Sequence, residues 1–237
     1  MVLPPPWSRA ALVRCLAAHG LRLRGGFVPA PQDGLPPLPG GQAVAVVWLV
    51  AHAGSEMWPR FSVSAQARDG LPDPLDRWSR SIGDALADAL GGRGLYPAEG
   101  PPYHPFQRWA ARIEALPSSP LLLQMHPEFG LWHAYRFALA LPRLEADDLA
   151  GIQRQAAAPV ADPCLQCEEQ PCLHACPVDA FDGNGYAVQP CRTHVAGATG
   201  APCRSQGCLA RRACPVAEGL QYAPAHAAFH MEAFLRW

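Results

Sequence analysis

The spacing of eight cysteines near the end of this 237-residue chain constrains its fold more than any other feature. They form two dense groups with one isolated residue between them: Cys164, Cys167, Cys172 and Cys176; Cys191; Cys203, Cys208 and Cys214. Each dense group ends in Cys-Pro, at Cys176-Pro177 and Cys214-Pro215. Bacterial ferredoxins with two iron–sulfur clusters end their cysteine groups in this way, and the last cysteine of each group ligates the other cluster. Two [4Fe–4S] clusters need eight thiolates, which is the number present.

The crossover rule divides these cysteines into two sets. We expect one cluster to be held by the first set: Cys164, Cys167, Cys172 and Cys214. We expect the other to be held by the second set: Cys176, Cys191, Cys203 and Cys208. The alternative is two four-cysteine zinc sites, which the Cys-Pro endings and the isolated Cys191 fit poorly. His174 and His194 are alternate ligands only as a weaker possibility, and Cys15, far from the others, is interpreted as a buried structural thiol.

The composition argues against several classes of function. The formal net charge is -1 and only 16% of residues are charged, so nothing indicates binding to nucleic acid. All 19 basic residues are arginine, which excludes a Schiff-base lysine and a phosphate-loop lysine. No apolar stretch is long enough for membrane insertion, and the first 18 residues lack the pattern of a signal peptide. Clustered cysteines without a signal peptide favour a metal site in a reducing cytoplasm.

The rest of the chain predicts an α+β fold. Hydrophobic periodicity and turn residues predict these elements: helices over 8–18, 73–91 and 104–116; strands over 21–28, 43–50, 120–125 and 131–141; a turn over 126–130; a short helix and linker within 142–163; and a terminal helix over 226–237. Asp182-Gly183-Asn184-Gly185 predicts a hairpin turn, with a return strand over 186–189 that presents Cys191. We place a domain boundary near residue 160, between domains 1–160 and 161–237.

The strand over 131–141 is amphipathic in an unusual way. Alternation puts Tyr135 and Phe137 on a bulky face, and Arg136 with Ala138 and Ala140 on a face of small residues. One interpretation is a face on which a helix packs, with Arg136 paired to a carboxylate. The other is a flat floor for a planar cofactor, with Arg136 holding an anionic substituent.

Two resemblances join these observations. The cysteine segment resembles the cluster domain of epoxyqueuosine reductases and reductive dehalogenases, although its spacing is looser; both families hold two [4Fe–4S] clusters beside a corrinoid. The first 145 or so residues resemble cobalamin-processing chaperones of the CblC type, above all over 126–136, which reads His-Pro-Glu-Phe-Gly-Leu-Trp-His-Ala-Tyr-Arg. The resemblances imply a nitroreductase-like (CblC-like) sandwich followed by a ferredoxin-like domain with two clusters. They also imply candidate corrinoid contacts: His126, Phe129, Gly130, Trp132 and Arg136.

Three functions follow as hypotheses. In the first, the chain passes electrons through two [4Fe–4S] clusters to a bound corrinoid such as cobalamin, reducing it or removing its upper ligand, with an external ferredoxin or flavodoxin as donor. In the second, it is a ferredoxin-like electron-transfer or partner-binding protein without a corrinoid. In the third, it is a corrinoid-dependent reductase of the epoxyqueuosine reductase type, for which the sequence singles out no proton donor.

Overall fold

The computed structural model describes residues 8–236 and divides into two compact units. The first unit contains residues up to 52 together with 56–115 and 134–159. The second unit contains residues 53–55, 116–133 and 160 onward. The segment 116–133, which we assigned to the first domain from the sequence, therefore packs with the cysteines.

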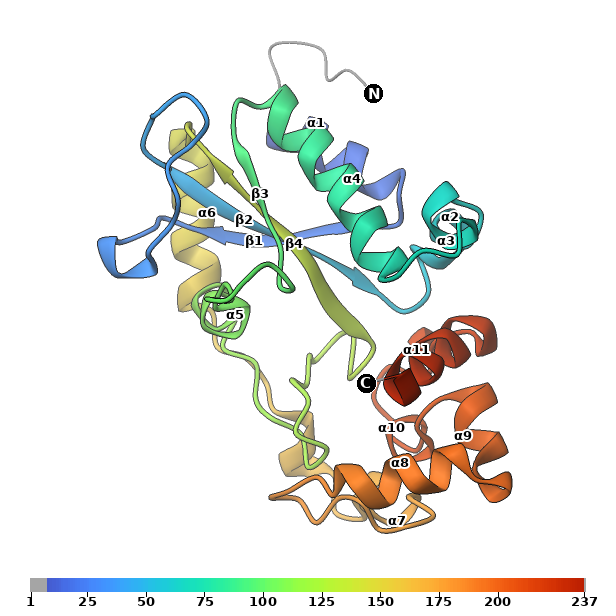
Figure 1. Ribbon diagram of the computed structural model, residues 1–237. Helices are drawn as coiled ribbons and strands as arrows, with labels where there is room; N and C mark the ends of the chain where they lie inside the picture. The colour runs from blue at the N-terminus through green and yellow to red at the C-terminus, as the bar shows by residue number, and fades with distance from the viewer. Residues whose placement is uncertain (1–7, 237) are drawn as a thin grey trace. The chain divides into compact units, whose positions relative to one another are not determined.

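A four-stranded sheet in the order β1-β2-β4-β3 organises the first unit (Figure 1). Strand β1 pairs antiparallel with β2, and β3 pairs antiparallel with β4. The elements of this unit, with β2 ending one residue beyond it and β4 beginning one residue before it, are as follows: α1 (Arg9–Ala17), β1 (Arg22–Phe27), a 3₁₀ turn over Pro31–Asp33, β2 (Val46–Ala53), α2 (Trp58–Phe61), α3 (Ala65–Arg68), α4 (Pro74–Ala89), β3 (Arg93–Leu95), α5 (Phe106–Ile113), β4 (His133–Leu141) and α6 (Ala146–Ala157). The α+β class that we expected is confirmed, whereas the nitroreductase-like description stays a prediction.

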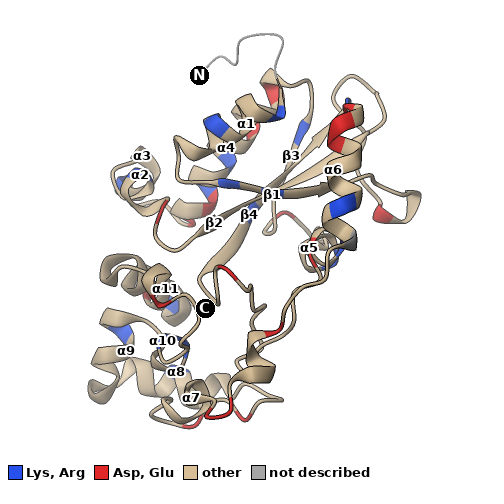
Figure 2. Cartoon of the chain, turned by 180° about the vertical axis from the view of Figure 1, so that it is seen from behind, with Lys and Arg blue, Asp and Glu red and all other residues tan. Residues whose placement is uncertain are grey.

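Helices cover both faces of this sheet. In Figures 1 and 2, α1 and α4 lie on one side, and α5 and α6 lie on the other. Val47 and Leu49 of β2 pack with Trp109 and Ile113 of α5 in a fully buried cluster. Val46, Val50 and the other residues of β2 are also buried, because both faces of the strand are covered. This explains the continuous apolar run that predicted a central strand.

The predicted faces of β4 are wrong at one point. Arg136 shares no face with Ala138: its Nη2 donates to Asp76 Oδ1 of α4 at 2.7 Å and its Nε donates to Ser79 Oγ at 3.2 Å. Phe137 also contacts α4, beside Gly83. Ala138 lies in the α5 cluster instead. The alternation therefore breaks between Arg136 and Phe137, because the guanidinium needs the polar partners that α4 supplies.

The second unit is built from short helices. Its elements are 3₁₀ turns over Pro163–Gln166, Ala198–Gly200 and Glu218–Leu220, and α7 (Pro171–His174), α8 (Val188–Ala196), α9 (Ala201–Gln206), α10 (Leu209–Arg212) and α11 (Pro224–Arg236). The longest, α11, packs mainly on α9 and also contacts α8. Among residues 8–236, no helix is long and apolar enough to cross a membrane.

Three local predictions are wrong. Residues 120–125 form a turn rather than a strand, because Leu122 adopts a left-handed backbone conformation with φ of 59°. Residues 186–189 make only an isolated bridge, Phe181 to Tyr186, before α8 begins at Val188; Cys191 is thus presented by a helix. Cys15 is half-buried rather than buried.

A buried ion pair joins β1 to the segment after α5. Arg24 Nη2 lies 2.6 Å from Glu114 Oε1, and the two side chains are only 5% and 10% exposed. The Tyr135 hydroxyl donates to the same carboxylate oxygen at 2.7 Å, and the Arg24 guanidinium lies over the Tyr135 ring. Burial and the Glu114 carboxylate raise the pKa of Tyr135, so its hydroxyl remains a donor.

Replacing Glu114 by alanine should leave the Arg24 charge buried without this carboxylate. We expect the free energy of unfolding to fall by about 3–5 kcal/mol, measured by urea denaturation. Glu99→Ala is the control, because that carboxylate is half exposed and lies 3.8 Å from Arg80; its effect should stay below about 1 kcal/mol. Equal effects of the two substitutions would contradict the structural role of the buried pair.

Candidate metal centre

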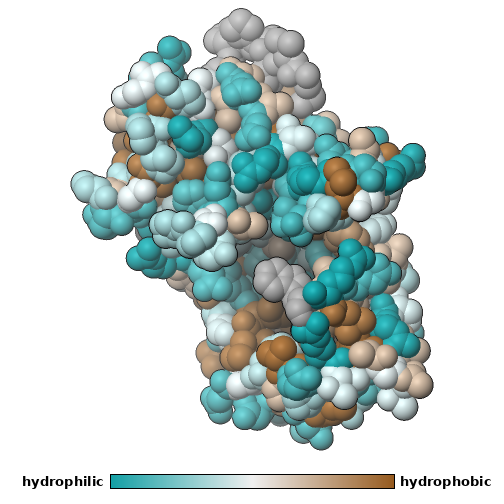
Figure 3. Space-filling model, viewed as in Figure 1, coloured by the Kyte–Doolittle hydropathy of each residue, from teal (hydrophilic) through white to brown (hydrophobic). Residues whose placement is uncertain are grey.

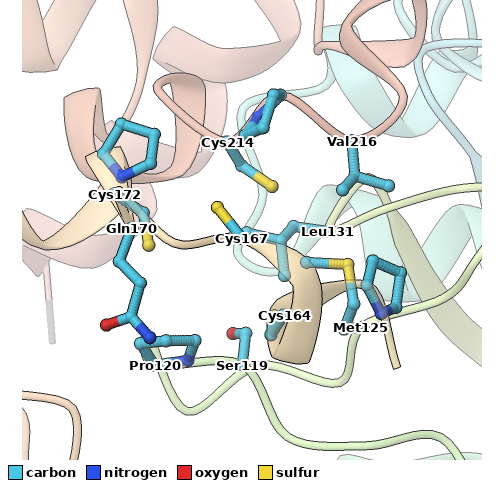
Figure 4. A pocket seen from close by; sticks show the side chains of 13 residues that line it. Ser119, Pro120, Met125, Leu131, Cys164, Cys167, Gln170, Cys172, Cys214 and Val216 are labelled. Atoms are coloured by element: carbon cyan, nitrogen blue, oxygen red, sulfur yellow. The ribbon is translucent and has the colours of Figure 1, made fainter.

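The four cysteines of the first set line one cavity. Figure 4 shows Cys167 and Cys214 pointing toward each other across it. The remaining wall is mostly apolar: Ser119, Pro120, Met125, Leu131, Pro163, Gln170, Pro171, Pro215 and Val216. The space not filled by protein atoms is about 360 Å³. Residues more than 40 positions apart in the sequence thus converge on one site.

Local structure explains how the first dense group reaches this cavity. Asp162 Oδ1 accepts a hydrogen bond from the Cys164 N–H at 2.9 Å and fixes the start of the 3₁₀ turn. Gln170 adopts a left-handed conformation with φ of 40°, and Pro171 then opens α7, on which Cys172 lies. The lengthened spacing before Cys172 therefore forms the loop that leads into this helix.

The other side of the first cavity is built by the segment 116–133, which the sequence did not assign to the cysteines. Met125 and Leu131 from this segment are buried against the cavity. Gly130 has φ of 56°, and a Cβ at this position would lie 2.5 Å from the Val216 carbonyl oxygen. Only glycine allows the turn over 126–130 to approach the Cys214-Pro215-Val216 segment so closely.

The four cysteines of the second set line another cavity. It contains about 320 Å³ of space outside protein atoms, and its other walls are mainly apolar: Pro177, Val178, Phe181, His194, Val195, Leu209, Ala210 and Met231. Cys191 comes from α8, Cys203 from α9, and Cys208 directly precedes α10. His194 lies in this wall, whereas His174 ends α7; their role as alternate ligands stays a prediction.

The thiol electrostatics follow the same two sets. Burial raises the pKa of Cys164 to about 11, and Asp162, Cys214, Cys172 and Cys167 add to the rise. Burial likewise raises the pKa of Cys172 and of Cys214, and Cys167 contributes to both. In the second set, burial raises the pKa of Cys203 and of Cys208, and Cys191 and Cys176 contribute to both. The pKa of these thiols is thus raised by other cysteines of the same set.

Four thiols around each cavity offer the donors for either a single metal ion or a cluster. Within residues 8–236, no three His, Cys, Asp or Glu side chains are placed to hold one metal ion. A zinc ion would draw four sulfurs to about 2.3 Å from a single point. A [4Fe–4S] cluster binds each thiolate to a different iron, so the sulfurs stay farther apart around a larger core. Four cysteines spread around an apolar cavity have the donor chemistry that such a cluster needs.

The candidate corrinoid contacts fall in both units. His126 Nδ1 accepts hydrogen bonds from the N–H groups of Glu128 and Phe129, at 3.0 and 3.1 Å, and its ring stacks on Phe129. Gly130 closes the same turn. These residues belong to the second unit, whereas Arg136 belongs to the first, where it pairs with Asp76. Their proposed role toward a corrinoid stays a prediction.

Trp132 lies in an aromatic cluster that sequence reasoning missed. It is buried, with its ring edge-on to Tyr222 at 5.3 Å. The Arg211 guanidinium lies over both rings, at 4.4 and 4.6 Å from their centroids. Tyr222 also stacks on the buried His226, whose Nδ1 lies 3.0 Å from Ser55 Oγ. The cluster ties segment 116–133 to α10 and α11 and so supports the wall of the first cavity.

Comparison with known proteins gives fold-level matches. No protein-family model matches the chain, and no curated protein matches it. Epoxyqueuosine reductase from Bacillus subtilis matches at 16% identity and a TM-score of 0.43, over 88% of this chain and 64% of that chain. A selenomethionine-labelled epoxyqueuosine reductase matches at 17% identity and a TM-score of 0.45, over 88% and 64%. An epoxyqueuosine reductase with an epoxyqueuosine-modified tRNA-Tyr stem loop matches at 16% identity and a TM-score of 0.41, over 86% of this chain and 62% of that chain.

These matches describe similarity over most of this chain, and the chain spans less than two thirds of the length of each matched protein. The resemblance of the first 145 residues to CblC-type chaperones stays a prediction.

The raised pKa of Cys164 predicts slow alkylation of the metal-free chain. Only the thiolate reacts with iodoacetamide. With a pKa of about 11, the thiolate fraction at neutral pH is about 300-fold lower than for an ordinary cysteine, whose pKa is about 8.5. We expect labelling of Cys164, followed by mass spectrometry, to be slower by about that factor than in the urea-unfolded chain, and to rise with pH up to about 11. A labelling midpoint near pH 8.5 in the folded chain would contradict the burial described.

Proposed function

We propose that this chain is an iron–sulfur redox protein that holds two [4Fe–4S] clusters. The observation that carries the proposal is the convergence of the eight cysteines, four by four, on two separate cavities. Each cavity takes cysteines from both dense groups. Such clusters, when bound, supply one-electron transfer at low potential.

The residues of the chain have three tasks in this function. The cysteines hold the clusters as thiolates, so loading displaces protons from thiols whose pKa is raised in the metal-free chain. Apolar neighbours such as Met125, Leu131 and Val195 exclude water from the cavities. Low polarity and restricted solvent access are among the factors that set cluster potential.

We propose an external ferredoxin or flavodoxin as the electron donor. Leu165, between the ligands Cys164 and Cys167, is 85% exposed. An external protein can therefore approach the backbone that carries the first set. Figure 3 shows further apolar surface on the face of this unit, and Leu122, Leu123 and Val188 of the unit are exposed.

We propose a corrinoid as the electron acceptor, from the resemblance of 126–136 to cobalamin-processing chaperones. Reduction of cobalt toward Co(I) needs a strongly reducing donor, and iron–sulfur clusters reach reduction potentials as low as about −700 mV. His126 and Phe129 in the turn would contact the corrinoid, and Arg136 would bind an anionic substituent.

A second candidate is an electron-transfer protein without a corrinoid. The observation that favours it is the ion pair of Arg136 with Asp76 at 2.7 Å, with Arg136 only 11% exposed. The guanidinium that would bind the corrinoid already has a carboxylate partner. Trp132, another candidate corrinoid contact, is likewise already buried, beneath the Arg211 guanidinium.

Metal analysis tests the cluster proposal directly. After anaerobic purification or reconstitution, we expect about eight iron and eight sulfide per chain. Cys172→Ala should remove the first cluster and Cys203→Ala the second, each leaving about four iron and one EPR signal in the reduced protein. Cys15→Ala is the matched control and should keep both clusters, because Cys15 lies in neither cavity. Stoichiometric zinc without sulfide would overturn the proposal.

Titration with hydroxocobalamin tests the acceptor. For the corrinoid function, we expect a change in corrin absorbance with saturable binding, retained after gel filtration. Arg136→Ala should weaken the binding about tenfold or more, since a charge-assisted contact is lost. Arg143→Ala, an exposed arginine outside the proposed contacts, should leave it unchanged. Loaded clusters with no corrin binding would favour the second candidate.

A further inference from the structure

One residue in the wall of the second cavity differs chemically from the others. Apart from the four cysteines and His194, the wall consists of apolar or thioether side chains: Pro177, Val178, Phe181, Val195, Leu209, Ala210 and Met231. None of these carries a side-chain nitrogen or oxygen. Among the described residues that line this cavity, His194 is therefore the one whose side chain offers a ring N–H.

The Nε2 atom of His194 is buried and, within residues 8–236, has no hydrogen-bond partner. The other ring nitrogen, Nδ1, lies 3.5 Å from Thr199 Oγ1, at the long limit for a hydrogen bond. When the Thr199 hydroxyl donates to Nδ1, the single proton of the neutral imidazole is on Nε2. Buried N–H groups are almost always paired in folded proteins, so this donor calls for an acceptor.

The ring of His194 has one nitrogen on each side of the cavity wall. His194 and the cysteine Cys191 are three residues apart on α8, so they share a face of the helix, and both line the cavity. Thr199 is exposed and lies outside the wall. Because Nδ1 is directed to Thr199, Nε2 is the nitrogen on the cavity side.

The end of α8 fixes this arrangement. Arg204 of α9, the helix that lies beside α8 in Figure 1, donates to the Val195 and Gly197 carbonyl oxygens. The turn over 198–200 packs against the same end, where a Cβ on Gly200 would overlap the His194 carbonyl oxygen. The backbone on both sides of the His194 ring is thus held in place.

The side-chain acceptors that this wall offers to Nε2 are sulfur atoms. They belong to the cysteines of the second set and to Met231. A bound [4Fe–4S] cluster would add its sulfides and convert the thiols to thiolates, which accept hydrogen bonds better than neutral sulfur does. The buried Nε2 atom is therefore an observation that fits a sulfur-rich group in this cavity.

We propose that the His194 Nε2–H group donates a hydrogen bond to a sulfur of the second cluster and thereby raises the reduction potential of that cluster. The inference rests on the proposed function and deepens it. Reduction adds one electron and makes the sulfurs more negative, so the bond stabilises the reduced state more than the oxidised state. The proton stays on Nε2, and no covalent bond forms or breaks.

Hyperfine spectroscopy of the reduced wild-type protein tests the bond directly. With both clusters loaded and the histidines labelled with ¹⁵N, we expect a weak ¹⁵N coupling and an exchangeable proton coupling at the second cluster. Cys172→Ala, which leaves the second cluster alone, assigns these signals. Both signals should be absent from His194→Leu, whereas a second exchangeable coupling from the Ala180 N–H, which donates to Cys176 Sγ at 3.3 Å, should remain.

Potentiometric titration measures the effect of the bond. His194→Leu should lower the potential of the second cluster by about 59 mV, which corresponds to a tenfold change in the equilibrium constant for one electron. The potential of the first cluster should not change. His194→Gln, whose amide can donate a hydrogen bond, should recover part of the shift. His174→Leu is the matched control, because this histidine is exposed and lies in neither cavity wall; it should move neither potential.

The possible outcomes separate this inference from the proposed function. Absence of iron and sulfide from the wild-type protein would overturn the proposed function as a whole. Two bound clusters without a histidine coupling, or with the large ¹⁵N coupling of a nitrogen bound to iron, would overturn this inference alone. Because these signals are measured on the wild-type protein, they decide the question even where His194→Leu fails to hold its clusters.

Discussion

The second unit depends on the convergence of distant thiols. The first cavity takes Cys164, Cys167 and Cys172 from the first dense group and Cys214 from the second. The second cavity takes Cys203 and Cys208 from the second dense group, the isolated Cys191, and Cys176 from the first group. A bound cluster would therefore cross-link separate short helices, in the way that structural metals contribute free energy to small domains. Short helices of four to nine residues, such as α7 and α8, are marginal alone. Packing of these helices around the cavities supplies the stability that each helix lacks by itself.

The first cavity also depends on a segment that contains no cysteine. Segment 116–133 is irregular, yet it supplies Met125, Leu131 and the turn at Gly130. Arg211 holds this segment by lying over Trp132 and donating to the Leu131 carbonyl oxygen. Because the segment is irregular, this guanidinium links it to α10 in place of regular backbone hydrogen bonds. The arginine beside the cysteines therefore has a structural role.

Elements with strong local sequence patterns could be predicted from the sequence. The apolar run before Ala53 predicted β2, and Asp73-Pro74 predicted the start of α4. Cysteine spacing predicted the two sets of residues that the structure brings together. It did not reveal that 120–125 turns at Leu122 or that Cys191 lies on a helix, because both depend on packing within the second unit. Nor did it reveal the partner of Arg136, since Asp76 lies 60 positions away in the sequence.

The raised pKa of the buried thiols has a consequence for the newly made chain. Oxidation of cysteine to sulfenic acid begins from the thiolate, and susceptibility follows thiolate character and exposure. Buried thiols such as Cys172 and Cys203 are kept in the neutral form in the metal-free chain. Under the proposed function, the chain is then a poor substrate for peroxides before clusters are loaded. The same burial that shapes the cavities thus protects the thiols that would hold the clusters.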